Sequence, residues 1–189
     1  MRSTSTDMKP GSSISERLRV PRSNGWVVWM GLRPARLAPP LQCSDIDCDP
    51  VHGLAGDHYA GRTKRTRQVT LIQHEHLAVI AALTRNPVAP EQLRRNIVVA
   101  GINLLALNGT VFRVGAVLLR GTGLCQPCSR MEAALGPGGY SAMLGHGGIT
   151  AQVLRGGRIL IDDPVAPAQA DLFDEAASAP SLLPEERSR

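Results

Sequence analysis

Residues 121–150, GTGLCQPCSRMEAALGPGGYSAMLGHGGIT, hold two of the four cysteines of this 189-residue chain and one of its five histidines. Thirteen of the nineteen glycines lie between positions 101 and 157. Glycine adopts positive φ angles and lets a ligand approach the backbone closely, so glycine gathered around two cysteines indicates a pocket. A run of tight turns between short strands would give the same pattern, and both interpretations stand at this point.

Short apolar segments lie on both sides of this stretch and predict β-strands. Their lengths and β-branched content are typical of buried strands. They are residues 26–32, 68–73, 96–100, 104–107, 111–120, 149–154 and 158–161. We expect Asn108-Gly109 to form a hairpin turn, Gly115 to be a bulge, and Gly156-Gly157 to join the last two strands as a hairpin.

Helical signals are fewer and shorter. Leu77, Ile80, Ala81 and Thr84 share one face, which predicts a helix over residues 74–84. Pro90 opens a short helix through residue 95. Ser129 with Glu132 resembles a capping box and predicts a helix over residues 129–135. The fold class that follows is mainly β, a barrel core with a few short helices, because strands do not alternate with long helices.

The domain organisation follows from shifts in composition. Residues 1–25 are rich in Ser, Thr and Arg and predict a disordered N-terminal segment. Residues 26–163 form one domain, in which the Pro-rich residues 41–51 are expected to be a surface loop. Residues 164–189 are predicted to be a mobile acidic, Ala/Pro-rich tail. No signal peptide or membrane-spanning run is found, so we expect a cytoplasmic protein without a membrane partner and without structural disulfides.

The amino-acid composition limits the kinds of partner that we expect the chain to bind. Aromatic residues make up only 3% of the chain, which excludes a single-strand nucleic-acid binder that stacks bases on exposed rings. The net charge of +5 comes almost entirely from arginine, and the arginines are scattered along the chain. We therefore expect a small anionic ligand and no nucleic acid, because the guanidinium group suits phosphate and carboxylate.

Cys125-Gln-Pro-Cys128 is the sharpest chemical motif, and three interpretations of it remain open. A redox dithiol would use a thiolate at a helix N-terminus. Half of a zinc site would need a second pair, for which Cys43 and Cys48 are loosely spaced. A single thiolate bound to a soft metal would leave the other cysteine unused.

Histidines and acids supply weaker candidates. His146, within GHGG, has small neighbours that would let its imidazole approach a ligand, although the pattern favours a histidine that bonds its own loop. Asp57 and His58 are a candidate acid–base pair, although the pattern favours an aspartate that braces its own loop. His74 and His76 are two residues apart, on different helix faces, and are expected at the surface.

Several segments together resemble the MOSC domain, the family named for the C-terminal part of molybdenum cofactor sulfurases. The resemblance covers about residues 26–163, in order, and is strongest to short stand-alone bacterial members. The segments that carry it are WMGLRPAR (29–36), GLAGDHYAG (53–61), RQVTLIQHEHL (67–77), RRNIVVAGINLLAL (94–107), GTGLCQPCSRME (121–132) and GPGGYSAMLGHGGITAQVL (136–154).

The resemblance implies a MOSC-type β-barrel and a cysteine that ligates molybdenum of the molybdopterin cofactor or carries sulfur. We assign this cysteine to Cys128, with Cys125 as the second choice. A thiolate suits a polarisable metal. Arginine side chains are candidates for the cofactor's phosphate, and Asp57, Asn96 and His146 for other cofactor contacts. The arginines are Arg62, Arg94, Arg95 and Arg130.

The function that the resemblance implies is a molybdenum-dependent oxidoreductase that reduces N-hydroxylated or N-oxygenated small molecules. The chain shows no flavin or iron–sulfur signature, so electrons would come from an external donor. It has no aminotransferase-like domain, so any sulfur would come from a donor protein. Family members are also associated with pyridoxal phosphate binding. Two alternatives are a non-catalytic carrier of the cofactor or its sulfur, and a thiol redox module using Cys125 and Cys128.

Overall fold

The computed structural model describes residues 24–59 and 65–168. In this part of the chain, the mainly β fold is confirmed. The strands are β1 (Gly25–Leu32), β2 (Leu41–Gln42), β3 (Asp45–Asp49), β4 (Gly53–Leu54), β5 (Val69–Gln73), β6 (Ile97–Ala100), β7 (Val111–Val114), β8 (Val117–Leu124), β9 (Ile149–Arg155), β10 (Gly157–Leu160) and β11 (Pro164–Pro167). The helices are α2 (His74–Thr84), α3 (Pro90–Leu93), α4 (Ser129–Leu135) and α5 (Gly139–Ala142), with 3-10 turns η1 (Arg65–Arg67) and η2 (Leu104–Leu107).

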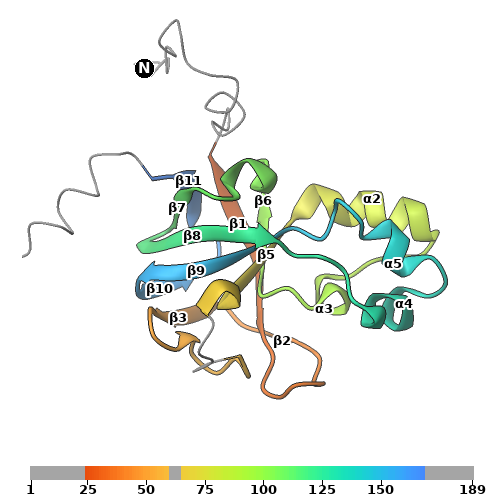
Figure 1. Ribbon diagram of the computed structural model, residues 1–189, viewed down its shortest axis with the longest axis horizontal. Coiled ribbons are helices and arrows are strands. Elements are labelled where there is room, and N and C mark those ends of the chain that lie inside the picture. The colour runs from red at the N-terminus through yellow and green to blue at the C-terminus, as the bar shows by residue number, and fades with distance from the viewer. Residues whose placement is uncertain (1–23, 60–64, 169–189) are drawn as a thin grey trace, which may run out of the picture.

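Seven strands close into a barrel in the order β11-β7-β8-β9-β5-β6-β1, and β11 pairs back onto β1. All neighbours are antiparallel except β5 and β6, which run parallel with Leu71 opposite Ile97. A parallel pair needs a crossover connection, and here α2 and α3 supply it. Figure 1 shows the short helices gathered on one side of the barrel.

Two apolar cores follow from the alternation of side chains along the strands. Met30, Leu71 and Val99 point into the barrel, whereas Trp29 and Ile72 belong to a second core beneath the helices. Strands β1, β5 and β6 are therefore buried on both faces, which explains their continuous apolar sequences. The second core is completed by helix residues, namely Leu77, Ile80, Leu93, Met131, Leu135, Ala142 and Met143.

A small three-stranded sheet, in the order β10-β3-β4, lies beside the barrel. The prediction of a surface loop over residues 41–51 was wrong, because Ile46 and Cys48 alternate inward and are buried on β3. The predicted hairpin of residues 149–161 was also wrong. β10 begins at Gly157, which has a φ of 150°, and pairs with β3 so that Gly157 lies opposite Cys48.

Three further expectations fail for local reasons. Residues 104–107 form a 3-10 turn, since the Asn103 side chain accepts from the Leu105 N–H at 3.0 Å. Gly115, with φ of 55°, is in the two-residue turn between β7 and β8 rather than in a bulge. Ser129 is not the N-cap of α4; Cys128 occupies that position.

The ends of the domain differ slightly from expectation. β1 begins at Gly25, and residues 164–167, predicted to start the tail, form β11 in the barrel. The rest of the predicted N-terminal segment and tail, residues 1–23 and 169–189, lies outside the described residues. The helices in residues 24–59 and 65–168 are all too short or too polar to cross a membrane.

Candidate functional site

The two cysteines of the CxxC motif lie where β8 leaves the barrel and α4 begins. Cys125 follows the last residue of β8 and is only 2% exposed. Cys128, three residues later, is exposed at the N-cap of α4, and its side chain makes no capping hydrogen bond. Both are free thiols, as are Cys43 and Cys48. The pair is therefore asymmetric: one thiol faces solvent and the other is enclosed.

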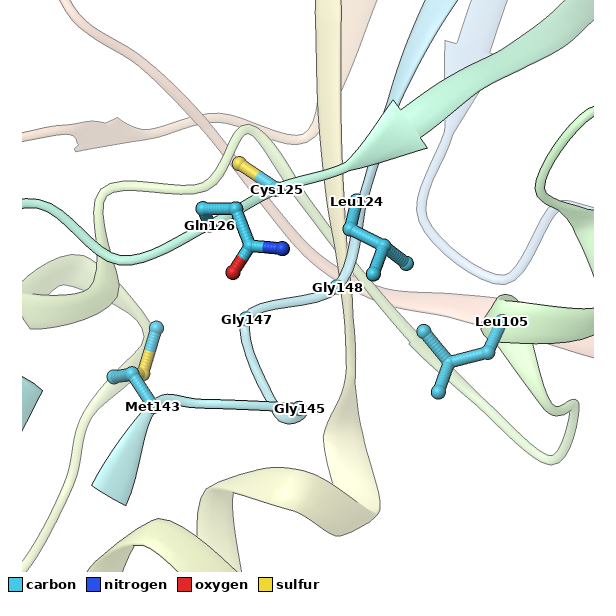
Figure 2. Close-up of a pocket in the computed structure, with 8 residues that line it drawn as sticks. All are labelled: Leu105, Leu124, Cys125, Gln126, Met143, Gly145, Gly147 and Gly148. Carbon is cyan, nitrogen blue, oxygen red and sulfur yellow. The ribbon is translucent and has the colours of Figure 1, made fainter. Parts of the chain in front are cut away.

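Cys125 is held through its backbone. Its N–H donates to Gly148 O at 2.9 Å, and its carbonyl accepts from Arg95 Nη2 at 3.0 Å. Its sulfur lies 3.7 Å from Arg67 Nη2. In Figure 2 the sulfur points away from Gly145 and the glycine loop. The Cys125 thiol thus faces an arginine, while its backbone is joined to the loop that contains His146.

Arg95 is buried, with 6% of its surface exposed, and all three of its guanidinium nitrogens donate to backbone carbonyls. Nε bonds Gly147 O at 2.8 Å, Nη1 bonds Leu93 O at 2.9 Å, and Nη2 bonds Cys125 O. In the described part of the chain no carboxylate forms an ion pair with it. Burial lowers the pKa of Arg95, and the Cys125 and Cys128 thiols oppose that shift.

A second buried polar group links Arg33 with Asp57, which is 4% exposed. Arg33 Nε and Nη2 donate to the two Asp57 carboxylate oxygens, both at 3.1 Å. Burial alone would raise the pKa of Asp57, but the hydrogen bonds and charge of Arg33 outweigh it and hold this pKa below its ordinary value. This is a bidentate, charge-compensated pair.

Asn96, fully buried at the start of β6, completes this group. Its amide nitrogen donates to Asp57 Oδ2 at 2.8 Å and to Gly31 O at 3.3 Å. Its side-chain oxygen accepts from Thr70 Oγ1 at 2.7 Å and from Arg33 Nη2 at 3.3 Å. Every polar atom of the Asn96 side chain is engaged within the protein, so Asn96 and Asp57 brace the site rather than face solvent.

Arg94 connects this group to the cysteines. It ends α3 in the left-handed conformation with φ of 57°, and its guanidinium donates to backbone carbonyls of the loop after β1. The shortest of these bonds, from Nη1 to Ala38 O, is 2.9 Å. Burial lowers the pKa of Arg94, as do the charges of Arg33 and Arg130, whereas Cys128 raises it.

These interactions define an arginine cluster around the two thiols: Arg33, Arg67, Arg94, Arg95 and Arg130. Asp57 is a carboxylate that acts on Arg94, and Arg33 already compensates it. The cluster therefore carries excess positive charge next to an exposed thiol. Such a field favours an anionic ligand.

Most of the predicted site residues come together here. Asp57, Asn96, Arg94, Arg95, Arg130, Cys125 and Cys128 lie within one electrostatic neighbourhood. Arg62 lies outside the described residues. Sequence reasoning missed Arg33, Arg67 and Thr70 as site residues. Arg33 and Arg67 do lie within segments that carry the family resemblance, but no spacing rule singles them out.

His146 has a different neighbour. Its ring meets that of His76 on α2 edge to face, with centroids 4.9 Å apart and planes at 75°. Both Nδ1 atoms are buried without a hydrogen-bond partner among the described residues. Burial lowers the pKa of His76, and the charge of His146 adds to this effect. His76 was predicted to lie at the surface; it is partly exposed, and its ring packs against the GHGG loop.

A hollow of about 50 Å³ lies on the other side of Cys125, between exposed Leu105 and Leu124 and the glycine loop (Figure 2). Drug-sized and cofactor-sized ligands occupy pockets of roughly 300–1,000 Å³. This hollow is therefore too small for a pterin, and the glycine loop packs tightly against the backbone of Cys125. A cofactor-sized anion would have to lie against the open face next to Cys128.

The donor set excludes a four-cysteine zinc site within the described residues. No group of three or more His, Cys, Asp or Glu side chains converges there in metal-binding geometry. Cys48 lies on β3 of the small sheet, where burial raises its pKa to about 12, and Cys43 lies in the link between β2 and β3. What the site offers a metal is one exposed thiol, Cys128, in a positively charged setting.

Comparison with known proteins agrees with this architecture. The YuaD protein from Bacillus subtilis has a similar structure, with a TM-score of 0.68 and 22% identity over 78% of this chain and 98% of that one. YiiM from Geobacillus stearothermophilus is similar with a TM-score of 0.64 and 14% identity, over 77% of this chain and 75% of that one. YiiM from Escherichia coli is similar with a TM-score of 0.59 and 18% identity, over 76% of this chain and 70% of that one.

At the level of sequence, no curated protein matches the chain. The family comparison is positive, because the MOSC domain matches residues 50–166, more than half of the chain. That span contains both cysteines and four of the five clustered arginines. MOSC domains are associated at family level with the molybdenum cofactor. The chain belongs to the MOSC domain family.

Proposed function

We propose that the protein binds the molybdenum cofactor, with the Cys128 thiolate as the protein's ligand to molybdenum. The observation that carries this proposal is the exposed thiol of Cys128 beside an arginine cluster with excess positive charge. A soft thiolate suits molybdenum, and guanidinium groups suit the phosphate of the pterin. The cofactor needs only a single thiolate from the protein, and the site presents one.

The solvent exposure of each site residue indicates the role that it would have in binding the cofactor. Cys128 is exposed and would contact the metal, whereas Cys125 is buried and held through its backbone. Arg130 is partly exposed next to Arg94 and is the best-placed candidate for the phosphate. Asp57 and Asn96 have their polar atoms engaged, so they would orient Arg33 and the start of β6 rather than touch the cofactor.

We further propose that the holoprotein reduces N-hydroxylated or N-oxygenated small molecules. Bound molybdenum supplies two-electron redox chemistry with transfer of an oxygen atom. The chain's residues would hold and neutralise the anionic cofactor, and a separate donor protein would supply electrons. The four free thiols are consistent with a reducing compartment, so we place the protein in the cytoplasm.

A carrier of the cofactor or its sulfur is the second candidate. It is favoured by the exposure of Cys128 and by the absence, among the described residues lining this face, of an enclosed cavity of cofactor size. A carrier must release its cargo to another protein, and an open site allows this. The thiol redox module is supported less, because Cys125 is enclosed.

Metal analysis of matched variants tests the assignment. Wild-type protein, Cys128→Ser and Cys125→Ser are purified from a host that makes the cofactor, and molybdenum and pterin are measured per folded chain. We expect near-stoichiometric metal in the wild type and at least a tenfold loss in Cys128→Ser, with Cys125→Ser largely unaffected. A folded wild-type protein without molybdenum would refute both the enzyme and the carrier. Loss in Cys125→Ser alone would move the ligand to Cys125.

A second measurement separates enzyme from carrier. The metal-loaded protein is assayed for hydroxylamine reduction with an artificial electron donor, with Cys128→Ser as the control. Turnover that disappears with Cys128→Ser supports the reductase. If the loaded protein is inactive but passes its molybdenum to a cofactor-free acceptor enzyme, the carrier is supported.

A further inference from the structure

Arg95 is the most unusual charged residue of the domain. It is buried, it lacks a carboxylate partner among the described residues, and it lies directly beneath the CxxC segment. Burying an unpaired charge is costly, so proteins keep such a group only where it is hydrogen-bonded or serves the site. Arg95 satisfies its donors with three carbonyls, and these belong to three separate segments of the chain.

Two of these three segments are the ones that flank the thiols. Cys125 O and Gly147 O are joined through Arg95, and Cys125 N–H closes the arrangement by donating to Gly148 O. The packing is tight, because a Cβ added to Gly147 would overlap Cys125 O and lie 3.2 Å from Arg95 Nη2. The planar guanidinium group, with its donors in a fixed fork, suits carbonyls that lie on separate segments.

We infer that Arg95 is a positioning residue: it fixes the Cys125–Cys128 segment to the glycine loop and supplies part of the positive potential at Cys128. Its charge acts on both thiols. The inference rests on the proposed function only for the identity of the anion, the molybdenum cofactor. The positioning and the potential are properties of the cofactor-free protein and can be measured there.

The potential is tested by the ratio of two alkylation rates at Cys128, quantified by peptide mass spectrometry. Iodoacetate is anionic and iodoacetamide is neutral, so their ratio reports local charge and cancels changes in thiolate fraction. We expect Arg95→Met to lower the ratio about two- to fivefold, as for loss of one nearby charge at a solvent-exposed site. Arg95→Lys should keep most of the ratio. Arg155→Met, at an exposed arginine outside the cluster, is the control and should leave it unchanged.

Positioning is tested by hydrogen exchange at Cys125 and at residues 145–148. Arg95→Lys keeps the charge but not the planar fork, so we expect at least tenfold faster exchange there. If Arg95→Met does not fold, Arg95→Lys still tests the positioning role. Unchanged exchange in Arg95→Lys, or an unchanged alkylation ratio in folded Arg95→Met, would overturn the inference. Both results stand whether or not the wild type contains molybdenum, so they are distinct from failure of the proposed function.

Discussion

Arg33 and Arg95 belong to the same site, but their charges meet different partners. Arg33 forms a bidentate pair with Asp57. Asn96 Nδ2 also donates to Asp57 Oδ2, and Thr70 Oγ1 donates to Asn96 Oδ1. The charges of Arg33 and Asp57 therefore compensate each other within the protein. Arg95 is more deeply buried, its hydrogen bonds go to carbonyls, and its charged neighbours include Arg67 and Arg33 as well as the two thiols. It is satisfied in hydrogen bonds but keeps its charge uncompensated.

This difference separates scaffold from site. A compensated buried pair has nothing left to offer a ligand and acts through the geometry that it enforces. An uncompensated guanidinium group beneath an exposed thiol leaves positive potential at the surface, where an anion can bind. The compensated Arg33–Asp57 group therefore holds the barrel end in shape. We propose that the Arg95 side of the same site attracts the anionic ligand.

Breaking the compensated pair should give the largest effect on stability. Asp57→Ala leaves the Arg33 charge and the Asn96 amide without their partner in the interior. We expect a loss of about 3–5 kcal/mol in the free energy of unfolding, as for other buried pairs that lose one member. Denaturant unfolding at pH 7 measures it. Asp57→Asn, which keeps the shape and some hydrogen bonds, should lose clearly less.

The pH dependence of the stability lost in Asp57→Asn sharpens the comparison between the Arg33–Asp57 pair and Arg95. Because the pKa of Asp57 is lowered in the folded protein, its stabilisation is present above the unfolded value of about 4 and is lost as pH falls through the folded value. The difference between wild type and Asp57→Asn should therefore shrink in acid. A difference that is constant from pH 7 to pH 3 would contradict a compensated ion pair.

The Arg95 side of the site is best tested by a substitution that disturbs its backbone contacts. Gly147→Ala places a Cβ against Cys125 O and Arg95, so we expect a loss of about 1–3 kcal/mol, as for overpacking of a close contact. Cys125 should also become measurably more reactive towards neutral thiol reagents. Gly123→Ala is the matched control, since its nearest neighbour, Thr150 Oγ1, would be 3.7 Å away. Equal effects of the two substitutions would show that the contact does not hold Cys125.

The barrel was predictable because its strands carry local signals. Residues 68–73 and 96–100 read as strands from composition, and α2 begins and ends where the spacing of Leu77 and Ile80 places it. The predictions failed where pairing is decided by distant residues. β3 has only two inward apolar side chains, and β10 pairs with β3 across more than a hundred residues instead of with its neighbour β9.

The site was predictable as a set of residues but not as a set of roles. The CxxC motif and family resemblance brought out Cys128, Asp57, Asn96 and Arg94. Only the fold distinguishes the bonded Asn96 from the exposed Cys128, because burial and partners are tertiary properties. Arg33 went unnoticed since its partner, Asp57, lies 24 residues away in an unrelated loop.

The smallest expected effect concerns His76, which packs against the loop that Arg95 holds. Burial and the His146 charge lower its pKa, while a hydrogen bond to the His146 backbone and the charge of Glu75 oppose the shift. The folded state therefore favours the neutral ring. As pH falls below the ordinary imidazole value of about 6.5, the unfolded chain binds this proton first and the protein loses stability.

His76→Phe should remove this part of the pH dependence between pH 7.5 and 5.5, measured by denaturant unfolding at each pH. The change should be smaller than for Asp57→Ala or Gly147→Ala, because the His76 ring is only partly buried. His74→Phe, at an exposed position of α2, is the matched control for the change of side chain. If His76→Phe and wild type show the same slope, the imidazole pair does not couple α2 to the glycine loop through its charge.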